Sequence, residues 1–141
     1  MNTVTHNTRA LITGGSGFIG SHLAEALLIR GYDVNIIDNL STGQPENVKH
    51  LSKQASSMFT NQSFEFIKED ILNQVVLDQL VSQCDVIFHM AAAVGVKLIV
   101  DNPIHTIETN IIGTKTVLDT ALRHRKKILV ASSSEVYGKG V

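Results

Sequence analysis

The hydrophobic pattern of the chain alternates between short apolar runs and longer stretches with helical periodicity. Short runs that are rich in β-branched side chains and bounded by turn residues are typical of strands. We therefore predict five strands, in the segments RALIT (9–13), YDVNIID (32–38), SFEFIKED (63–70, ending near Lys68), DVIFHMAAA (85–93) and KILVASSS (127–134). The fourth is apolar almost throughout, as strands covered on both faces are.

Amphipathic helices are predicted between these strands. A helix over Phe18–Arg30 is followed by Gly31, where a C-terminal capping glycine belongs, and has one apolar face made of Ile19, Leu23, Ala26 and Leu27. A short helix is expected over Val75–Gln83. The stretch from Asn39 to Gln62 begins as a polar Gly/Pro loop and is too weakly patterned for an element to be assigned.

A long helix is predicted after the fourth strand. Pro103 is suited to its first turn, and the apolar periodicity continues to His124. We expect its inward face to consist of Ile104, Ile107, Ile111, Leu118 and Ala121.

Strand and helix thus alternate along the chain. This order predicts an α/β fold with a doubly wound parallel sheet, the Rossmann type, truncated after its fifth strand. With 141 residues, of which 43% are apolar and 18% charged, the chain has the size and composition of one domain, here residues 1–141.

Charge and cysteine content exclude several functions. A formal net charge of −1 gives no reason to expect a nucleic-acid partner. The single cysteine, Cys84, cannot form a disulfide framework, and the six histidines lack metal-ligand spacing, so we expect no metal site. Since no apolar run approaches a membrane span and MNTVTHNTR lacks an apolar signal core, we expect no membrane association and a cytoplasmic location.

The segment LITGGSGFIG carries the main candidate site. Gly14, Gly17 and Gly20 are spaced three apart between a predicted strand and helix, and Asp38 ends the next strand, eighteen residues after Gly20. This arrangement is typical of dinucleotide binding: a tight turn, close approach of backbone to a pyrophosphate, close helix packing, and an acid for the ribose. The alternative is that the glycines only shape a turn.

The spacing within TGGSGFIG resembles that of the extended short-chain dehydrogenase/reductase family, which includes nucleotide-sugar epimerases, dehydratases and decarboxylases. DNLSTG (38–43), EDI (69–71), HMAAAVGV (89–96) and ETNIIGT (108–114) resemble further motifs of that family. The resemblance implies NAD as cofactor, with an Asp on the adenine amino group and an Asn that holds the site together. It implies binding by Gly14, Gly17, Phe18, Ile19, Gly20, Asp38, Asn39, Ser41, Thr42, Gly43, Asp70, Ile71, Met90, Ala91, Ala92, Ala93 and Asn110.

SSSEVYG (132–138) resembles the segment that carries the family's catalytic Ser or Thr. The resemblance makes Ser133 the hydrogen-bonding partner of the reacting sugar oxygen, and aligns Ser134 and Glu135 with polar residues of dehydratases and decarboxylases. Glu135 then becomes a candidate proton shuttle, although it equally fits a solvated loop acid. Ser133 has an alternative as an ordinary strand-end hydroxyl, and His89 is expected to be a hydrogen-bonded core residue.

The family's Tyr-x-x-x-Lys pair is absent from these 141 residues. The sequence therefore resembles the front half of an NAD-dependent epimerase or dehydratase that acts on UDP- or dTDP-sugars. We expect this half alone to be inactive, with KILVA left exposed at a sheet edge. A non-catalytic dinucleotide-binding module and another extended short-chain reductase remain alternatives. Relatives often dimerise through the helices after strands four and five, so a homodimer is possible.

Overall fold

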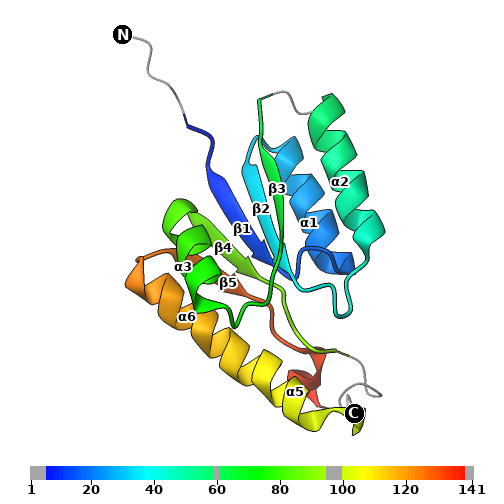
Figure 1. Ribbon diagram of the computed structural model, residues 1–141, viewed down its shortest axis with the longest axis vertical. Coiled ribbons are helices and arrows are strands. Elements are labelled where there is room, and N and C mark those ends of the chain that lie inside the picture. Colours follow the sequence, from blue (N-terminus) through cyan, green and yellow to red (C-terminus); the bar gives the residue numbers. More distant parts are fainter. Residues whose placement is uncertain (1–5, 59–60, 95–99, 139–141) are drawn as a thin grey trace.

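The computed structural model of the chain describes residues 6–58, 61–94 and 100–138. Five strands form one parallel sheet in the order β3-β2-β1-β4-β5, as Figure 1 shows. The strands are β1 (Arg9–Thr13), β2 (Asp33–Asp38), β3 (Phe64–Lys68), β4 (Val86–His89) and β5 (Lys127–Val130). The predicted doubly wound fold is confirmed. In a parallel sheet all carboxyl ends lie at one edge, which places the site-bearing loops together.

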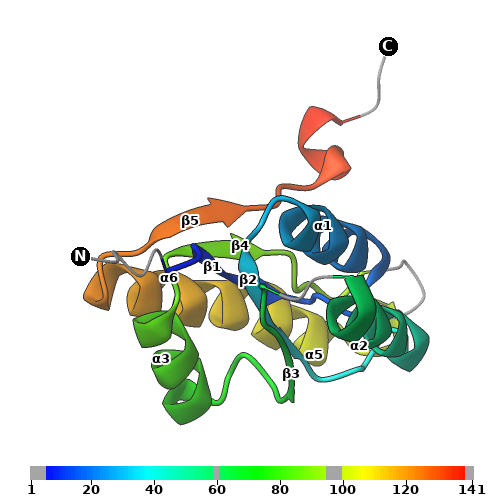
Figure 2. The same cartoon turned by 90° about the horizontal axis from the view of Figure 1, so that it is seen from above.

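Helices cover both faces of the sheet (Figure 2). Helices α1 (Phe18–Ile29) and α2 (Pro45–Met58) pack on β1, β2 and β3. The opposite face is covered by α3 (Gln74–Gln83) and by a long helix built from α5 (Pro103–Ile107), the π-helix η1 (Glu108–Gly113) and α6 (Thr114–Arg123). A short 3₁₀ helix, η2 (Ser134–Tyr137), follows β5.

Alternate side chains of strands β1 to β4 pack into two separate cores, one on each face of the sheet. Ala10 and Ile12 of β1 pack with α1 and α2, whereas Leu11 between them packs with α3 and α6. All three are fully buried, because successive side chains of a strand point to opposite faces and both faces are covered here.

Helix α2 lies in the stretch to which the sequence assigned no element. Its exposed side chains are mostly polar, and its one buried residue is Leu51, which is 1% exposed and packs in the α1-side core. Val48, Leu51 and Ala55 recur at helical spacing on its less exposed side, but so few apolar residues in an otherwise polar stretch gave a signal that was not assigned from the sequence.

The predicted inward face of the long helix was wrong except at Ala121. Ile104, Ile107, Ile111 and Leu118 are between 41% and 73% exposed. Smaller side chains and a glycine face the sheet side instead: Thr106, Gly113, Thr116, Val117, Thr120 and Ala121. Small residues permit the close helix approach seen at Gly113, where a Cβ would lie 2.6 Å from Ile71 Cδ1. The α1 face was also partly wrong, since Ile19 is 68% exposed.

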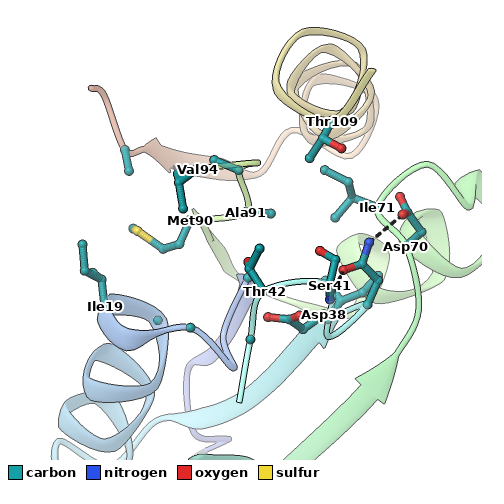
Figure 3. Close-up of a pocket in the computed structure, with 18 of the residues that line it drawn as sticks. Ile19, Asp38, Ser41, Thr42, Asp70, Ile71, Met90, Ala91, Val94 and Thr109 are labelled. Atoms are coloured by element: carbon teal, nitrogen blue, oxygen red, sulfur yellow. Dashed lines mark hydrogen bonds between the residues drawn. The ribbon is translucent and has the colours of Figure 1, made fainter. Parts of the chain in front are cut away.

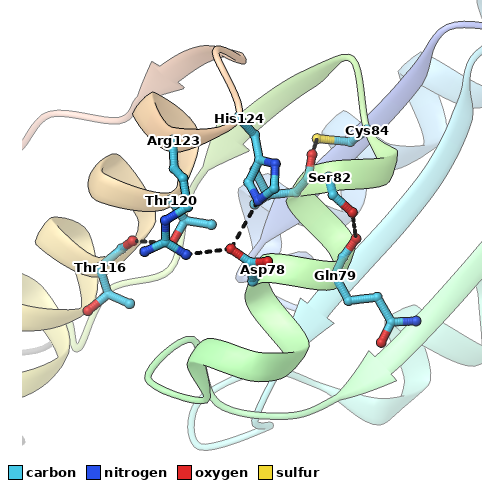
Figure 4. Close-up of polar contacts among 9 residues, drawn as sticks. Asp78, Gln79, Ser82, Cys84, Thr116, Thr120, Arg123 and His124 are labelled. Atoms are coloured by element: carbon cyan, nitrogen blue, oxygen red, sulfur yellow. Dashed lines mark hydrogen bonds and ion pairs between the residues drawn. The ribbon is translucent and has the colours of Figure 1, made fainter.

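Helices α3 and α6 are joined at the surface by an ion-pair cluster (Figure 4). Asp78 of α3 accepts hydrogen bonds from Arg123 at 2.5 Å and from the imidazole Nε2 of His124 at 3.0 Å. The hydrogen bond from His124, and then that from Arg123, holds the pKa of Asp78 below its ordinary value of 3.8. The cluster therefore ties these helices together most firmly when the carboxylate is ionised.

Strands β4 and β5 are shorter than predicted, ending at His89 and Val130. Beyond these residues the chain leaves the sheet and enters the loops at its carboxyl edge. β5 forms one edge of the sheet, with Leu129 49% and Val130 42% exposed, so the expectation of an exposed edge strand is confirmed. Over the described residues, no helix is both long and apolar enough to span a bilayer.

Candidate functional site: a pocket at the carboxyl edge of the sheet

A pocket of about 260 Å³ opens at the carboxyl ends of the strands (Figure 3). Of the residues predicted to bind a cofactor, all except Ala93 and Asn110 line it. The loop after β1, the loops after β2 and β3, and the segment after β4 each form part of the wall. Sequence reasoning did not select five other lining residues, namely Ile37, Glu69, Val94, Thr109 and Ala131.

Two glycines of the β1–α1 loop are required by the backbone itself. Gly14 has φ of 70°, a left-handed conformation, and a Cβ there would lie 2.7 Å from the backbone of Ala91. A Cβ on Gly20 would lie 2.3 Å from the carbonyl oxygen of Gly14. These glycines let the loop turn sharply and pack against its own helix and the β4 segment.

Gly17 differs from its neighbours because a side chain there would meet almost nothing in the described part of the protein. Its φ is −72°, and the nearest atom to a Cβ at this position would be the carbonyl oxygen of Gly14, at 3.4 Å. Gly17 is the N-cap residue of α1, makes no side-chain cap, and lines the pocket. The first-turn N–H groups of a helix have no acceptor within the helix, so this end of the pocket offers donors and a positive dipole end to an anion.

Asp38 ends β2 and is 9% exposed. Its Oδ2 accepts the backbone N–H of Ser16 at 3.0 Å, and its Oδ1 accepts that of Leu40 at 2.8 Å. The carboxylate thus joins the glycine loop to the loop after β2, where Leu40 has φ of 61°. Each oxygen keeps a lone pair that can accept a further hydrogen bond from the pocket.

Asn39 and Asp70 connect the loops that follow β2 and β3. The Nδ2 of Asn39 donates to Asp70 Oδ2 at 2.8 Å, the dashed line beside Asp70 in Figure 3. The Oδ1 of Asn39 accepts the backbone N–H of Ser41 at 2.9 Å. Together with Asp38 and Glu69, Asp70 makes this end of the pocket acidic.

A chain of buried and partly buried hydrogen bonds supports the pocket wall behind Ala91. The N–H of Ala91 donates to Thr13 Oγ1 at 3.2 Å, Thr13 Oγ1 bonds His89 Nδ1 at 2.7 Å, and His89 Nε2 bonds Thr114 Oγ1 at 2.9 Å. Burial lowers the pKa of His89 below its ordinary value of 6.5. His89 is therefore the hydrogen-bonded core residue expected from the sequence, and its burial favours the neutral imidazole.

Ala93 and Asn110 hold the wall instead of lining it. Asn110, in η1, accepts the N–H of Ala93 at 2.7 Å with its Oδ1 and donates to the carbonyl oxygen of Ala93 at 3.0 Å with its Nδ2. This paired contact fixes the segment after β4 against the long helix, which is the kind of structural role that the resemblance implied for Asn110. The neighbouring Thr109 then faces the pocket.

The three candidate catalytic residues follow β5. Ser133 is exposed and is not among the residues that line the pocket, although Ala131, two positions earlier, is. The backbone of Ser134 and Glu135 begins η2, and the side chains of these two residues lie outside the described part of the structure. Their catalytic roles stay predictions.

Known proteins resemble this chain in both sequence and fold. The family model described as GDP-mannose 4,6 dehydratase matches residues 11–140. The chain belongs to this family. The match, together with the relatives below, agrees with the resemblance to extended short-chain dehydrogenases/reductases that act on nucleotide sugars.

Curated relatives include decarboxylases of acidic nucleotide sugars. The chain is 46% identical over 132 residues to UDP-N-acetyl-alpha-D-glucosaminuronate decarboxylase of Bacillus cytotoxicus, covering 94% of this chain and 38% of the relative. It is 39% identical over 130 residues to UDP-glucuronic acid decarboxylase 4 of Arabidopsis thaliana, covering 92% and 27% respectively. The chain thus spans less than two fifths of the length of these relatives.

Solved structures with the same fold include epimerases with bound cofactor. UDP-glucose-4-epimerase from Stenotrophomonas maltophila, with NAD and formylated UDP-arabinopyranose, matches at a TM-score of 0.83 and 26% identity, over 95% of this chain and 39% of that one. The enzyme from Bifidobacterium longum, with NAD+ and UDP, matches at 0.81 and 29% identity, over 93% and 38%.

Proposed function

We propose that the chain is the NAD-binding part of an enzyme that acts on a nucleotide sugar. The observation that carries this proposal is the open cradle at Gly17. Gly14 and Gly20 are required by backbone packing, whereas Gly17 has room for a side chain within the protein and lines the pocket at the start of α1. A dinucleotide pyrophosphate explains why that space is kept free.

The rest of the pocket fits the remaining parts of NAD. The free lone pairs of Asp38 accept the hydroxyl groups of the adenosine ribose, and the carboxylate of Asp70 accepts the adenine amino group. Asn39, and no arginine, follows Asp38, so nothing at that position compensates the charge of a 2′-phosphate. The acidic end of the pocket, with Asp38, Glu69 and Asp70, thereby favours NAD over NADP.

NAD supplies a hydride acceptor, which suits enzymes that oxidise a sugar hydroxyl and later return the hydride. In this chain, Ser133 is the candidate donor to the reacting sugar oxygen, and Ser134 and Glu135 are candidates for contact with the sugar. The relatives named above act on UDP-sugars, which makes a UDP-sugar, or a related dTDP-sugar, the proposed substrate. Decarboxylation, epimerisation and dehydration all begin with the same oxidation.

The experiment that tests this function is to add NAD and a panel of UDP- and dTDP-sugars to the whole gene product. Products are then separated by chromatography, with the sugar acids included because two relatives are decarboxylases. Conversion of one of these sugars supports the proposed enzymatic function. NAD binding without conversion of any sugar favours a dinucleotide-binding module, and lack of NAD binding refutes both.

We further propose that two copies associate through the outward face of α5, η1 and α6. Exposed apolar side chains recur on this face at spacings of three, four, seven and four residues: Ile104, Ile107, Ile111, Leu118 and Leu122. In sedimentation velocity experiments, the wild-type chain is expected to be a dimer and the Ile111→Lys variant a monomer. A monomeric wild-type chain contradicts the proposal.

A cytoplasmic location is proposed as well, since Cys84 is a free, buried thiol whose pKa burial raises to about 11.

A further inference from the structure

Asn39 occupies a bridging position at the acidic end of the pocket. Its amide donates to the carboxylate of Asp70, thirty-one residues away in the chain, at 2.8 Å. The other end of the same amide accepts the N–H of Ser41 at 2.9 Å, which fixes the orientation of the Asn39 side chain. The donor that faces Asp70 is thus held in place by the loop after β2.

The carboxylate of Asp70 is held at both oxygens. Oδ2 accepts from Asn39, and Oδ1 accepts the backbone N–H of Leu72 at 2.9 Å. Two donors on different oxygens fix the rotation of the carboxylate plane, and each oxygen keeps an acceptor site. Glu69 does not compete for Asn39, because its own oxygens accept the N–H of Asp70 at 2.8 Å and the side-chain amide of Asn73 at 3.0 Å.

We infer that Asn39 is a positioning residue for Asp70 and thereby sets the selectivity of the pocket for a 6-aminopurine over a 6-oxopurine dinucleotide. An oriented carboxylate has only acceptors, so it bonds the amino group of adenine and faces the oxo group of hypoxanthine with two acceptors opposed. Without Asn39 the carboxylate loses one of its two fixed donors and turns more freely. The inference rests on the proposed function, since it requires NAD to bind with its adenosine between Asp38 and Asp70.

The test compares binding of NAD with binding of nicotinamide hypoxanthine dinucleotide, its 6-oxo analogue, by calorimetric titration. The wild-type chain is expected to bind NAD roughly 10-fold or more tightly than the analogue, as for a hydrogen bond to a charged group. Asn39→Asp keeps the oxygen that accepts from Ser41, removes the donor to Asp70 and places a like charge beside it. In this variant, the dissociation constant of the analogue divided by that of NAD is expected to fall toward one.

Ser41→Asp is the matched control. It adds the same charge to the same loop, and it leaves the backbone N–H that Asn39 accepts and the contact with Asp70 in place. This variant is expected to weaken both dinucleotides by a similar factor and to keep their ratio. A general loss of loop structure likewise moves both constants together, so the ratio reports on the orientation of Asp70. If Asn39→Asp does not fold, the same two dissociation constants are measured for Asn39→Ala, whose folding is checked by circular dichroism.

The outcomes separate this inference from the proposed function. If the wild-type chain binds NAD but shows no selectivity against the analogue, or if the Asn39 variants keep full selectivity, the inference is overturned and the NAD site stands. If the wild-type chain binds neither dinucleotide, the proposed function is overturned, and the inference is overturned with it.

Discussion

Gly17→Ala is expected to weaken NAD binding and Gly20→Ala to lower stability, although the two glycines are only three residues apart. A Cβ on Gly20 would lie 2.3 Å from the carbonyl oxygen of Gly14 and 2.7 Å from the Cα of Gly15. Both are backbone atoms, so the loop must move, and overpacking of this kind costs about 1–3 kcal/mol. For a domain of this size, that lowers the melting temperature by roughly 3–10 °C.

Gly17→Ala is expected to leave the fold nearly unchanged. The φ of −72° suits any residue, the nearest atom to the new Cβ is at 3.4 Å, and exchange of an N-cap glycine for alanine costs about 1 kcal/mol or less. The methyl group instead occupies the space proposed for the pyrophosphate. Displacement that breaks even one N–H contact to a charged phosphate oxygen weakens NAD binding by roughly 10-fold to 100-fold. Gly17→Val, which is larger, is expected to abolish binding while leaving most secondary structure.

The assay for these variants combines thermal unfolding by circular dichroism with calorimetric titration of NAD. Gly17→Ala is expected to melt close to the wild-type chain and to bind weakly, and Gly20→Ala is expected to melt lower. Wild-type NAD affinity in Gly17→Ala would show that the loop is only a turn. Unchanged melting of Gly20→Ala would show that the packing argument is wrong.

Four further results are expected. Asp38→Ala weakens NAD binding by about 1–3 kcal/mol in a titration, since it removes a charged acceptor; an unchanged constant rules out the ribose contact. His89→Gln reduces the loss of stability on acidification below about pH 6.5: burial lowers the folded-state pKa of His89, so below 6.5 the unfolded chain binds a proton that the folded chain resists. Chemical unfolding of the wild-type chain and the variant across pH 5–7 measures this, and free energies of unfolding that change with pH in the same way in both contradict it. Asp78→Asn flattens the fall in melting temperature below about pH 4, because the lowered pKa of Asp78 gives a stabilisation that is present above 3.8 and lost as pH falls through the folded-state value. The 141-residue chain, which contains no Tyr-x-x-x-Lys, turns over no UDP- or dTDP-sugar, and any product seen by chromatography contradicts this.

The strands and the glycine loop were predictable because their signals are local. β1 was predicted at its observed bounds, and Gly14 and Gly20 take the backbone roles that their spacing indicates. The orientation of the long helix was not predictable, since it has both a stripe of large apolar residues and a stripe of small ones. The sheet packs against the small stripe, which includes Thr120 and Ala121, and periodicity alone does not distinguish the two.

The pocket was largely predictable because family motifs mark the loops at the carboxyl edge. Of the lining residues missed, Ile37 and Glu69 adjoin selected ones, and Ala131 follows the fifth strand, where ligands of such sheets bind. Thr109 lies in the ETNIIGT motif beside the selected Asn110, and which of the two side chains faces the pocket depends on the packing of the π-helix. The contact of Asn39 with Asp70 joins two loops that only the fold brings together.

The central claim is that this pocket binds NAD and prefers it to NADP. Calorimetric titration of the 141-residue chain with each cofactor tests it most directly. The account predicts saturable binding of one NAD per chain and weaker binding of NADP, because the carboxylate of Asp38 repels a 2′-phosphate. Absence of NAD binding by the folded chain, or tighter binding of NADP, would contradict it.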